Sequence, residues 1–360
     1  MTLSSQKVRI VGSGLIGTSL ALALARSGHR IDLVDLHESH EKLARDLLGR
    51  AFDPEASLSP DLVVIATPIE EILPTLLVEY GRYPESRFID IGGLKSNLLL
   101  EVARIPGLNA KFLGSHPMAG REVSGPASAR ADLFEGRAWV ITPSSQTDNR
   151  FIAEMKELIL QTGASIFEVD PESHDEQIAL VSHLPQIVSS LLASQLLDHS
   201  PDELSLAGAG LRDTTRLAAS SANLWSQLLS LNSREVLPIL ERFNQSIDKL
   251  IDHLHSANVE GVKTCLEEGN AGRALIPGKH GGKGRDYHLL PIVIEDKPGQ
   301  LAKIFKECEK IDVNVEDLQI EHSPGQETGL VTLSLSESDA LALHAHLISE
   351  GWLAHKPITA

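Results

Sequence analysis

The stretch from Gly114 to Glu122, which reads GSHPMAGRE, contains the side chain best suited to proton chemistry in this sequence. His116 follows the apolar pair at 112–113, which predicts the end of a strand, and Pro117 disfavours helix at the residue before it. An imidazole has its unperturbed pKa near neutrality, so a histidine held at a strand end can accept or release a proton. Taken alone, the stretch is more typical of a loop histidine flanked by turn glycines. The rest of the chain must decide between the two interpretations.

A glycine-rich turn near the amino terminus has the spacing of a dinucleotide-binding loop. Residues 8–11 predict an apolar strand, the pattern G-x-G-x-x-G follows it directly, and a helical run comes next. In this pattern the first glycine permits a tight turn, the second lets the backbone approach a pyrophosphate, and the third lets the helix pack on the strand. The helix N-terminus then faces the anion with free N–H groups. The predicted cofactor contacts here are Gly12, Gly14, Leu15, Ile16 and Gly17.

An acidic residue stands at the position that would bind the adenosine ribose. A second strand, predicted at 31–34, ends in Asp35, close to the ~20-residue offset at which a carboxylate accepts hydrogen bonds from ribose hydroxyls. A carboxylate there would repel a 2′-phosphate, which favours NAD over NADP. His37 and Arg45 are near enough in sequence to leave that choice open.

Further strands alternate with helices, which predicts a doubly wound α/β sheet over residues 1–170. The predicted strands are 62–66, 87–91, 110–113, 138–142 and 165–169. Loops after such strands lie at the carboxyl edge of the sheet, where ligands bind. We therefore assign Thr67 and Pro68 to the cofactor site and Lys95 to an anionic substrate, although a lone lysine in a first helical turn is more often simply solvated.

The composition limits the classes of function. The chain has 360 residues and a formal net charge of −17, which argues against a nucleic-acid or anionic-membrane partner. Cys265 and Cys308 are far apart and lack metal-ligand spacing, so we expect neither a disulfide framework nor a metal site. No apolar run reaches membrane-spanning length, and a cytoplasmic location is expected.

Five motifs in this order resemble the prephenate dehydrogenase family of tyrosine biosynthesis. They are the glycine loop, D-x-G-x-x-K at 90–95, GSHPMAG at 114–120, SHLP at 182–185 and LRDTTR at 211–216. The segment from Ser124 to Gly136 resembles the family's lead-in to its last sheet strand. The resemblance covers roughly residues 7 to 256, and the two histidine motifs are far more specific than the glycine loop.

The resemblance implies an oxidative decarboxylation with NAD as cofactor. His116 would accept a hydrogen bond from the ring 4-hydroxyl of prephenate, and neutral imidazole would be the active form. One position departs from the family pattern, because the serine that helps to orient the histidine and the nicotinamide is Gly93 here. Ser115 or a water molecule would take its place, so Ser115 joins the predicted substrate site.

The middle of the chain predicts an all-helical domain over residues 171–270. A long helix from 172 to 197 would kink near His183, because Pro185 removes one of its backbone hydrogen bonds. His183 either caps the freed carbonyls or, by the resemblance, binds the substrate side chain. A guanidinium suits the carboxylates of prephenate, and the resemblance assigns the ring carboxylate to Arg216 and a supporting role to Asp213. The alternative is a surface ion pair between these two residues.

Long amphipathic helices are predicted from residue 222 to about 268. Trp225 lies among their periodic apolar positions, so we expect it in the core rather than in the site. So much apolar helix beside a nucleotide domain suggests an intertwined homodimer, which the resemblance also implies.

The last 90 residues predict a linker and a small regulatory domain. Residues 271–286 are glycine-rich and basic; the alternative to a linker is a flap that brings Arg273, Lys279 and Lys283 to the anionic ligands. Residues 287–360 predict the order βαββαβ, which is the ferredoxin-like arrangement. The predicted elements are strand 287–294, helix 301–310, strands 313–322 and 329–335, helix 339–349 and a short strand near Trp352.

This carboxyl-terminal domain resembles the amino-acid-binding ACT family. The resemblance rests on the turn D-K-P-G-Q-L after the first strand and on Asn314-Val315 before the second. Feedback by tyrosine is the implied regulation, and a purely structural dimerisation module is the alternative. The predicted effector contacts are Asp296, Pro298, Gly299 and Asn314.

Three other functions would fit parts of this sequence. A β-hydroxyacid dehydrogenase would need a catalytic lysine early in the helical domain, and the sequence has no lysine between Lys156 and Lys249. An arogenate dehydrogenase differs only in the side chain of its substrate and stays open. A non-catalytic sensor of NAD and amino acids would leave His116, His183 and Arg216 without a role.

Overall fold

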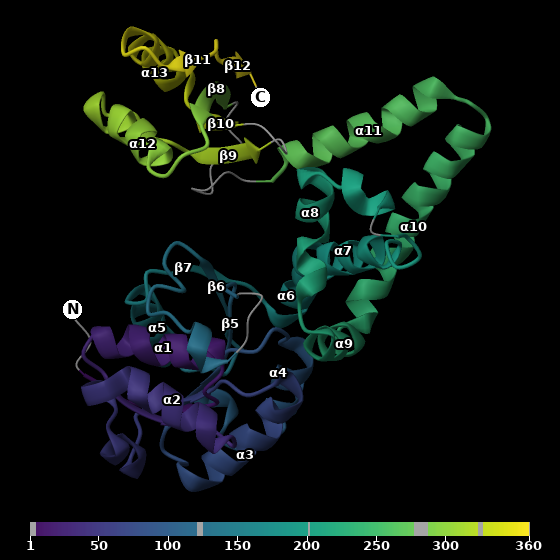
Figure 1. Ribbon diagram of the computed structural model, residues 1–360. Helices are drawn as coiled ribbons and strands as arrows, with labels where there is room; N and C mark the ends of the chain where they lie inside the picture. Colours follow the sequence, from purple (N-terminus) through teal and green to yellow (C-terminus); the bar gives the residue numbers. More distant parts are fainter. Residues whose placement is uncertain (1–4, 121–124, 201, 277–286, 323–326, 360) are drawn as a thin grey trace. The chain divides into compact units, whose positions relative to one another are not determined.

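The computed structural model describes residues 5–120, 125–200, 202–276, 287–322 and 327–359. It divides into two compact units, one ending at Asn244 and the other beginning at Gln245, and each is described by itself (Figure 1). Within the described residues, no helix combines the length and the apolar character that crossing a membrane requires.

The first unit begins with a seven-stranded sheet in the order β2-β1-β3-β4-β5-β6-β7. The strands β1 to β5 run parallel, β6 runs antiparallel to β5, and β7 runs parallel to β6. The strands are β1 Lys7–Val11, β2 Arg30–Val34, β3 Leu62–Ile65, β4 Arg87–Asp90, β5 Phe112–Pro117, β6 Ala138–Thr142 and β7 Ser165–Glu168.

Helices cover both faces of this sheet, because its parallel strands are apolar on both sides. Ile10, Val64 and Ile89 share a buried core with α1, α2 and α5, whereas Val63 and Phe88 point to the other face and pack with α3 and α4. The helices are α1 Leu15–Arg26, α2 Glu38–Leu48, α3 Ile72–Arg82, α4 Ser96–Val102 and α5 Asn149–Leu160. The predicted doubly wound nucleotide-binding fold is confirmed.

The strand that carries the key histidine differs from its prediction. We expected it at 110–113 with His116 beyond its end, but β5 runs to Pro117 and His116 pairs with Val140 of β6. The strand is longer because a second neighbour extends it. β4 pairs only with the first two residues of β5, and β6 pairs with β5 from Gly114 onward. His116 is therefore held by a backbone ladder rather than by a loop.

The helices that follow the sheet in the first unit are α6 Pro171–Ile178, α7 Leu184–Ser194, α8 Ala209–Thr215 and α9 Ala222–Leu231. The boundary between the units falls within α10 Ser233–His255, and α11 Val259–Ala274 belongs to the second unit. The predicted kink near His183 takes the form of a π-helical turn, Ala179–His183, between α6 and α7. Leu184 donates its N–H to the carbonyl of Ala179, five residues back. Pro185 has no N–H to continue the regular ladder, so the backbone accommodates one wider turn there.

The second unit contains a small antiparallel sheet in the order β11-β8-β10-β9, with β12 also paired to β8. Its elements are β8 His288–Glu295, α12 Gln300–Lys310, β9 Asp317–His322, β10 Thr328–Leu335, α13 Glu337–Ser349, β11 Leu353–Ala354 and β12 Ile358–Thr359. The order β11-β8-β10-β9 confirms the predicted ferredoxin-like sheet.

Two details of this unit correct the predictions. β9 starts at Asp317 rather than at 313, and α11 runs to Ala274, so the first residues of the predicted linker are helical. Lys279 and Lys283, which the flap alternative requires, lie outside the described residues, as do Arg121, Glu122 and Ser124.

Candidate active site

The glycine loop joins β1 to α1 and is closely packed against the loop that follows β3. Gly12 has φ +110°, a conformation that side-chain-bearing residues rarely adopt, and a Cβ there would overlap the carbonyl of Ala66. A Cβ on Gly17 would overlap the carbonyl of Gly12. These two glycines are therefore required by the close approach of neighbouring backbone.

Gly14 differs from its neighbours because open space lies in front of it. No atom would lie within 4 Å of a Cβ at this position, and no side chain caps the N-terminus of α1. Thr67 lies on the loop after β3, and within the described part of the chain its buried hydroxyl oxygen has no hydrogen-bond partner. A pyrophosphate bound between these groups would accept hydrogen bonds from the free N–H groups around Leu15 and Ile16. The residues thus fit a dinucleotide, with Pro68 exposed at the edge of the same loop.

Asp35 follows β2 and is tied to the glycine loop. Its Oδ2 accepts hydrogen bonds from the backbone N–H of Ser13 at 2.6 Å and from the Ser13 hydroxyl at 2.8 Å. Its Oδ1 accepts from the N–H of His37 at 2.8 Å. Partial burial opposes ionisation, but these hydrogen bonds lower the pKa of Asp35 below its ordinary value. The carboxylate is therefore ionised beside the loop where an adenosine ribose would lie.

Two glycine variants should separate folding from cofactor binding. Gly12→Ala is expected to destabilise the fold by roughly 1–3 kcal/mol through backbone strain, and by more through the overlap with Ala66. Gly14→Ala should leave the melting temperature within a few degrees of wild type but raise the Kd for NAD by about tenfold or more, which is about 1.4 kcal/mol. Thermal unfolding and NAD titration of both variants check this. Unchanged NAD affinity in Gly14→Ala would contradict the placement of the pyrophosphate.

His116 on β5 contacts a second histidine. Its Nδ1 lies 3.0 Å from Nε2 of His174, and the two rings meet edge to face with centroids 5.2 Å apart. Burial lowers the pKa of His116 well below its ordinary value, and repulsion by His174, Lys95 and His183 lowers it further against the attraction of Asp175. The imidazole is therefore neutral at physiological pH, as proton acceptance requires.

Asp175 connects this histidine pair to the start of α4. It accepts a hydrogen bond from Nδ1 of His174 at 2.7 Å, and it also accepts from the backbone N–H groups of Lys95 and Ser96, each at 2.9 Å. Sequence reasoning missed both His174 and Asp175, which lie on α6 and far from His116 along the chain. The only local signal is an adjacent His-Asp pair in the first turns of a helix that opens with Pro171.

Lys95 and Ser115 lie in a buried cluster around Asp90. Lys95 is fully buried, and its ammonium forms an ion pair with Asp90, which is also fully buried. Ser115 is fully buried too; its hydroxyl donates to the backbone carbonyl of Asp90 at 2.6 Å. The polar groups of both side chains are therefore engaged with Asp90. Gly114 packs against this cluster, and a Cβ there would lie 2.4 Å from Thr142 Oγ1 and 3.3 Å from Lys95 Cδ.

Gly93 lies beside the free side of His116. A Cβ at Gly93 would lie 3.9 Å from both Cε1 and Nε2 of the imidazole, and 3.2 Å from Cδ2 of Leu228 on α9. A serine at position 93 would therefore have its Cβ beside the edge of His116 formed by Cε1 and Nε2. Helix α9 covers this side and is also tied to the loop after β3 by a hydrogen bond from Gln227 to Glu70 at 3.0 Å.

His183, at the end of the π turn, is almost completely buried. Its ring meets Trp225 of α9 edge to face with centroids 5.8 Å apart, and its Nδ1 lies 3.3 Å from Nδ2 of Asn232. Asn232 also donates to the backbone carbonyl of Asp175 at 2.9 Å, so it joins both histidine environments. Burial lowers the pKa of His183 to about 4. Trp225 is partly exposed, and one edge of its ring packs on His183. This corrects the prediction that Trp225 lies in the core.

Arg216 and Asp213 lie at the end of α8, and both are exposed. The turn that begins with Arg216 is fixed on α7, because Gln186 donates to the carbonyl of Leu217 at 2.9 Å and Ser189 accepts from the N–H of Ala218 at 3.2 Å. The guanidinium is therefore presented on a turn anchored to the helix that follows His183.

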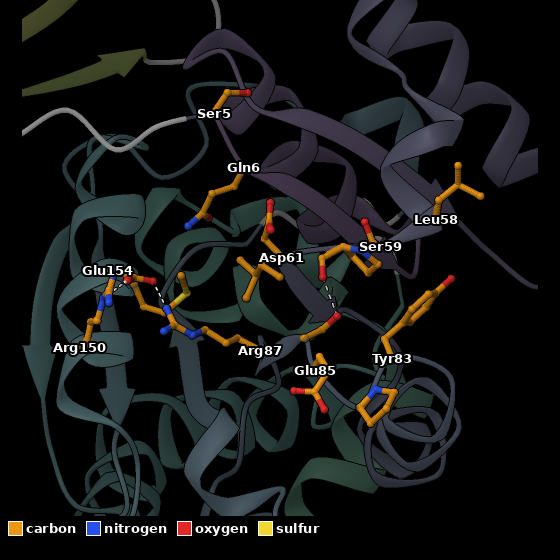
Figure 2. A pocket seen from close by; sticks show the side chains of 15 residues that line it. Ser5, Gln6, Leu58, Ser59, Asp61, Tyr83, Glu85, Arg87, Arg150 and Glu154 are labelled. Atoms are coloured by element: carbon orange, nitrogen blue, oxygen red, sulfur yellow. Dashed lines mark hydrogen bonds and ion pairs between the residues drawn. The ribbon is translucent and has the colours of Figure 1, made fainter.

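A separate cavity of about 850 Å³ lies at the opposite, amino-terminal edge of the parallel strands (Figure 2). Its lining includes Asp61 before β3, Tyr83 before β4, and Arg87, which pairs with Glu154. Ligands of open α/β sheets bind at the carboxyl edge, where His116 and the glycine loop lie. We therefore place the active site there and not in this cavity.

Comparisons with known proteins agree with this placement. The family model "Prephenate dehydrogenase, nucleotide-binding domain" matches residues 20–168, and "Prephenate dehydrogenase, dimerization domain" matches residues 170–268. Prephenate dehydrogenase of Bacillus subtilis (strain 168) is 28% identical over 345 residues, which is 92% of each chain.

Two solved structures are also similar. Prephenate dehydrogenase from A. aeolicus, in complex with hydroxyphenyl propionate and NAD+, has a TM-score of 0.69 at 28% identity and covers 76% of this chain and 99% of its own. Arogenate dehydrogenase of Synechocystis has a TM-score of 0.61 at 28% identity and covers 74% of this chain and 98% of its own.

Proposed function

Because the chain belongs to the prephenate dehydrogenase family, we propose that it oxidises and decarboxylates prephenate to 4-hydroxyphenylpyruvate with His116 as the proton acceptor. The observation that carries the proposal is the geometry of His116: its Nδ1 is engaged by His174, and its Nε2 lies on the side of Gly93, 3.9 Å from the position of a Cβ there. A neutral imidazole nitrogen in that position is the acceptor that the ring hydroxyl needs.

The cofactor is NAD, which accepts a hydride from the substrate when it is bound at the glycine loop. The protein's part is to bind, orient and handle the proton. His116 takes the hydrogen bond of the C4 hydroxyl as its C–H bond is lost, and it returns the proton to the phenol oxygen when carbon dioxide leaves C1. The electron pair of the broken C–C bond completes the aromatic ring, so no net proton is consumed.

The choice between prephenate and arogenate depends on the substrate side chain, and we assign that side chain to His183. Prephenate carries a keto acid there and arogenate an amino acid. Neutral His183 can donate one hydrogen bond to an oxygen, and no carboxylate in direct contact with His183 is described that would bind an ammonium. This supports prephenate. Rates with each substrate, in the presence of NAD and then NADP, test the assignment; a higher kcat/KM for arogenate would reverse it.

The pH dependence of the reaction should follow His116. Its pKa is lowered by burial and by neighbouring cations and histidines, and the neutral form is active, so kcat/KM should stay constant as the pH falls to the ordinary histidine value of about 6.5 and decrease only below it. Burial also lowers the pKa of His183, to about 4, so this histidine stays neutral over the same pH range. A pH profile with NAD and prephenate checks this. A loss of kcat/KM centred at or above pH 6.5 would contradict it.

We propose a homodimer, in line with the matching "dimerization domain". The helical region exposes many large apolar side chains, which is unusual for a monomer. They include Leu180, Val181, Leu191, Leu192, Leu237, Ile247, Ile251, Leu254 and Leu266. Sedimentation of the purified protein tests the assembly.

The ferredoxin-like sheet supports the proposal that the second unit is an ACT domain that binds tyrosine. Gly299 has φ +87° at the start of α12, so the turn that begins at Asp296 depends on a glycine. Asn314 precedes β9, and its amide donates to Glu316 at 3.1 Å. The proposed contacts are Asp296, Pro298, Gly299 and Asn314.

Tyrosine is therefore expected to lower the rate of the full-length enzyme, and Asn314→Ala should weaken the effect by about tenfold, because an amide that binds a charged ligand contributes roughly 1.5–3 kcal/mol. The measurement is the tyrosine dependence of NADH formation, with Asn258→Ala of the same unit as the control. If saturating tyrosine changes neither kcat nor KM of the wild type, the proposed effector is wrong.

A further inference from the structure

We propose that His174, anchored by Asp175, is a positioning residue that fixes the tautomer of His116, so that Nε2 of His116 is the unprotonated nitrogen facing the substrate. The inference rests on the proposed function for its kinetic consequence. The hydrogen-bond pattern itself concerns only residues of this chain.

The pattern starts at Asp175, which can only accept hydrogen bonds. Burial opposes its ionisation, but hydrogen bonds from His174, Ser96 and Lys95 lower the pKa of this carboxyl below its ordinary value. Two of the three donors are backbone N–H groups, which cannot change their role. An ionised carboxylate has no proton to offer, so the nitrogen of His174 that faces it must carry one.

The proton on His174 then determines the state of His116. If that is the only proton on His174, its Nε2 is bare, and this atom lies 3.0 Å from Nδ1 of His116. Two bare nitrogens would repel each other, so Nδ1 of His116 must be the donor. A neutral His116 with its proton on Nδ1 leaves Nε2 free to accept.

No other side chain described around His116 supplies this control. The position of the family serine is Gly93, and the hydroxyl of Ser115 is directed to the carbonyl of Asp90. The other charged or titratable groups that influence His116 are Lys95, whose ammonium is held by Asp90, and His183, which is bonded to Asn232. The low pKa of His116 agrees with a ring that carries a single proton.

The tautomer matters because the reaction needs an acceptor and not a donor. As the C4–H bond breaks and its electron pair leaves as hydride to NAD, the hydroxyl proton moves to Nε2 of His116 and a C=O bond forms. The proton already on Nδ1 stays hydrogen-bonded to His174, whose other nitrogen remains bonded to Asp175, so the positive charge on His116 is partly compensated. The opposite tautomer would present an N–H to the hydroxyl and could not take its proton.

Nitrogen NMR of the full-length protein, labelled with ¹⁵N in its histidines, reads the tautomer without any substrate. The signal of His116 is assigned by its loss in His116→Asn. We expect the wild type to hold its proton on Nδ1 and His174→Leu to shift it toward a mixture of both tautomers. A proton on Nε2 of His116 in the wild type, or a tautomer that is unchanged in His174→Leu, would overturn the inference.

Kinetics of two matched variants test the consequence. His174→Leu should lower kcat with prephenate by about 10²-fold while KM stays within about threefold, because the histidine is misoriented but the binding groups are intact. His174→Gln offers an amide oxygen that can accept a hydrogen bond from Nδ1 of His116. Its kcat should therefore be at least about tenfold higher than that of His174→Leu.

Equal activity of both variants and the wild type would overturn the role, as would a change confined to KM. If the wild type itself does not turn over prephenate, the proposed function fails, and the NMR result still decides the hydrogen-bond pattern. If His174→Leu does not fold, Asp175→Asn replaces it in the NMR comparison, and His174→Gln, which keeps an acceptor for Nδ1 of His116, should hold the wild-type tautomer.

Discussion

Replacing His116 with asparagine is expected to lower kcat for prephenate by roughly 10²- to 10⁴-fold, the contribution typical of a positioned proton acceptor. Asparagine keeps a polar side chain of similar reach on β5, but its weakly basic amide cannot take the hydroxyl proton. NAD binding should persist, because the glycine loop and Asp35 are positioned by β1, β2 and β3 rather than by β5.

Steady-state kinetics and NAD titration of the same variant provide the measurement. His199→Asn is a suitable control, because this histidine is exposed and lies beyond α7. Retained turnover in His116→Asn would contradict the assignment of His116 as the proton acceptor. Loss of NAD binding together with activity would mean that the fold, not the proton transfer, had been affected. A non-catalytic sensor would show no turnover in the wild type either.

Replacing Arg216 with leucine should raise KM for prephenate by roughly 10- to 100-fold, with a smaller effect on kcat. A guanidinium that binds a carboxylate contributes about 1.5–3 kcal/mol, and leucine keeps much of the apolar stem while removing the charge. The turn that carries Arg216 is anchored on α7 by Gln186 and Ser189, so the substitution should not unfold it.

Arg212→Leu is the matched control, because Arg212 is an exposed arginine on the same helix and donates only to the carbonyl of Ala207, at 3.3 Å, among its described hydrogen bonds. KM should be nearly unchanged in this variant. If both variants raise KM equally, the effect is the loss of general positive charge. If neither does, the ring carboxylate is bound elsewhere.

The sequence was most informative where a backbone requirement leaves a residue type no alternative. Gly12 and Gly17 are fixed by contacts with Ala66 and with each other, so the nucleotide loop could be located from spacing. The alternation of strands and helices likewise predicted both sheets, because each strand has to bury apolar residues on one face or both.

Contacts between distant segments could not be predicted in the same way. The spacing from Asp90 to Lys95 was interpreted as a ligand-binding loop, but the packed structure buries Lys95 completely and pairs it with Asp90. His174 meets His116 because α6 lies over the carboxyl end of β5, and nothing in a local pattern of residues reports that contact. Trp225 had helical periodicity typical of a core, but its ring faces His183.

The central claim is that this chain removes a hydride and a carboxylate from prephenate with His116 as proton acceptor. The most direct measurement mixes the full-length protein with prephenate and NAD near pH 8 and quantifies NADH, carbon dioxide and 4-hydroxyphenylpyruvate together. We predict equal amounts of all three with the wild type and none above background with His116→Asn. NADH formation without carbon dioxide, or equal product from both proteins, would contradict the account.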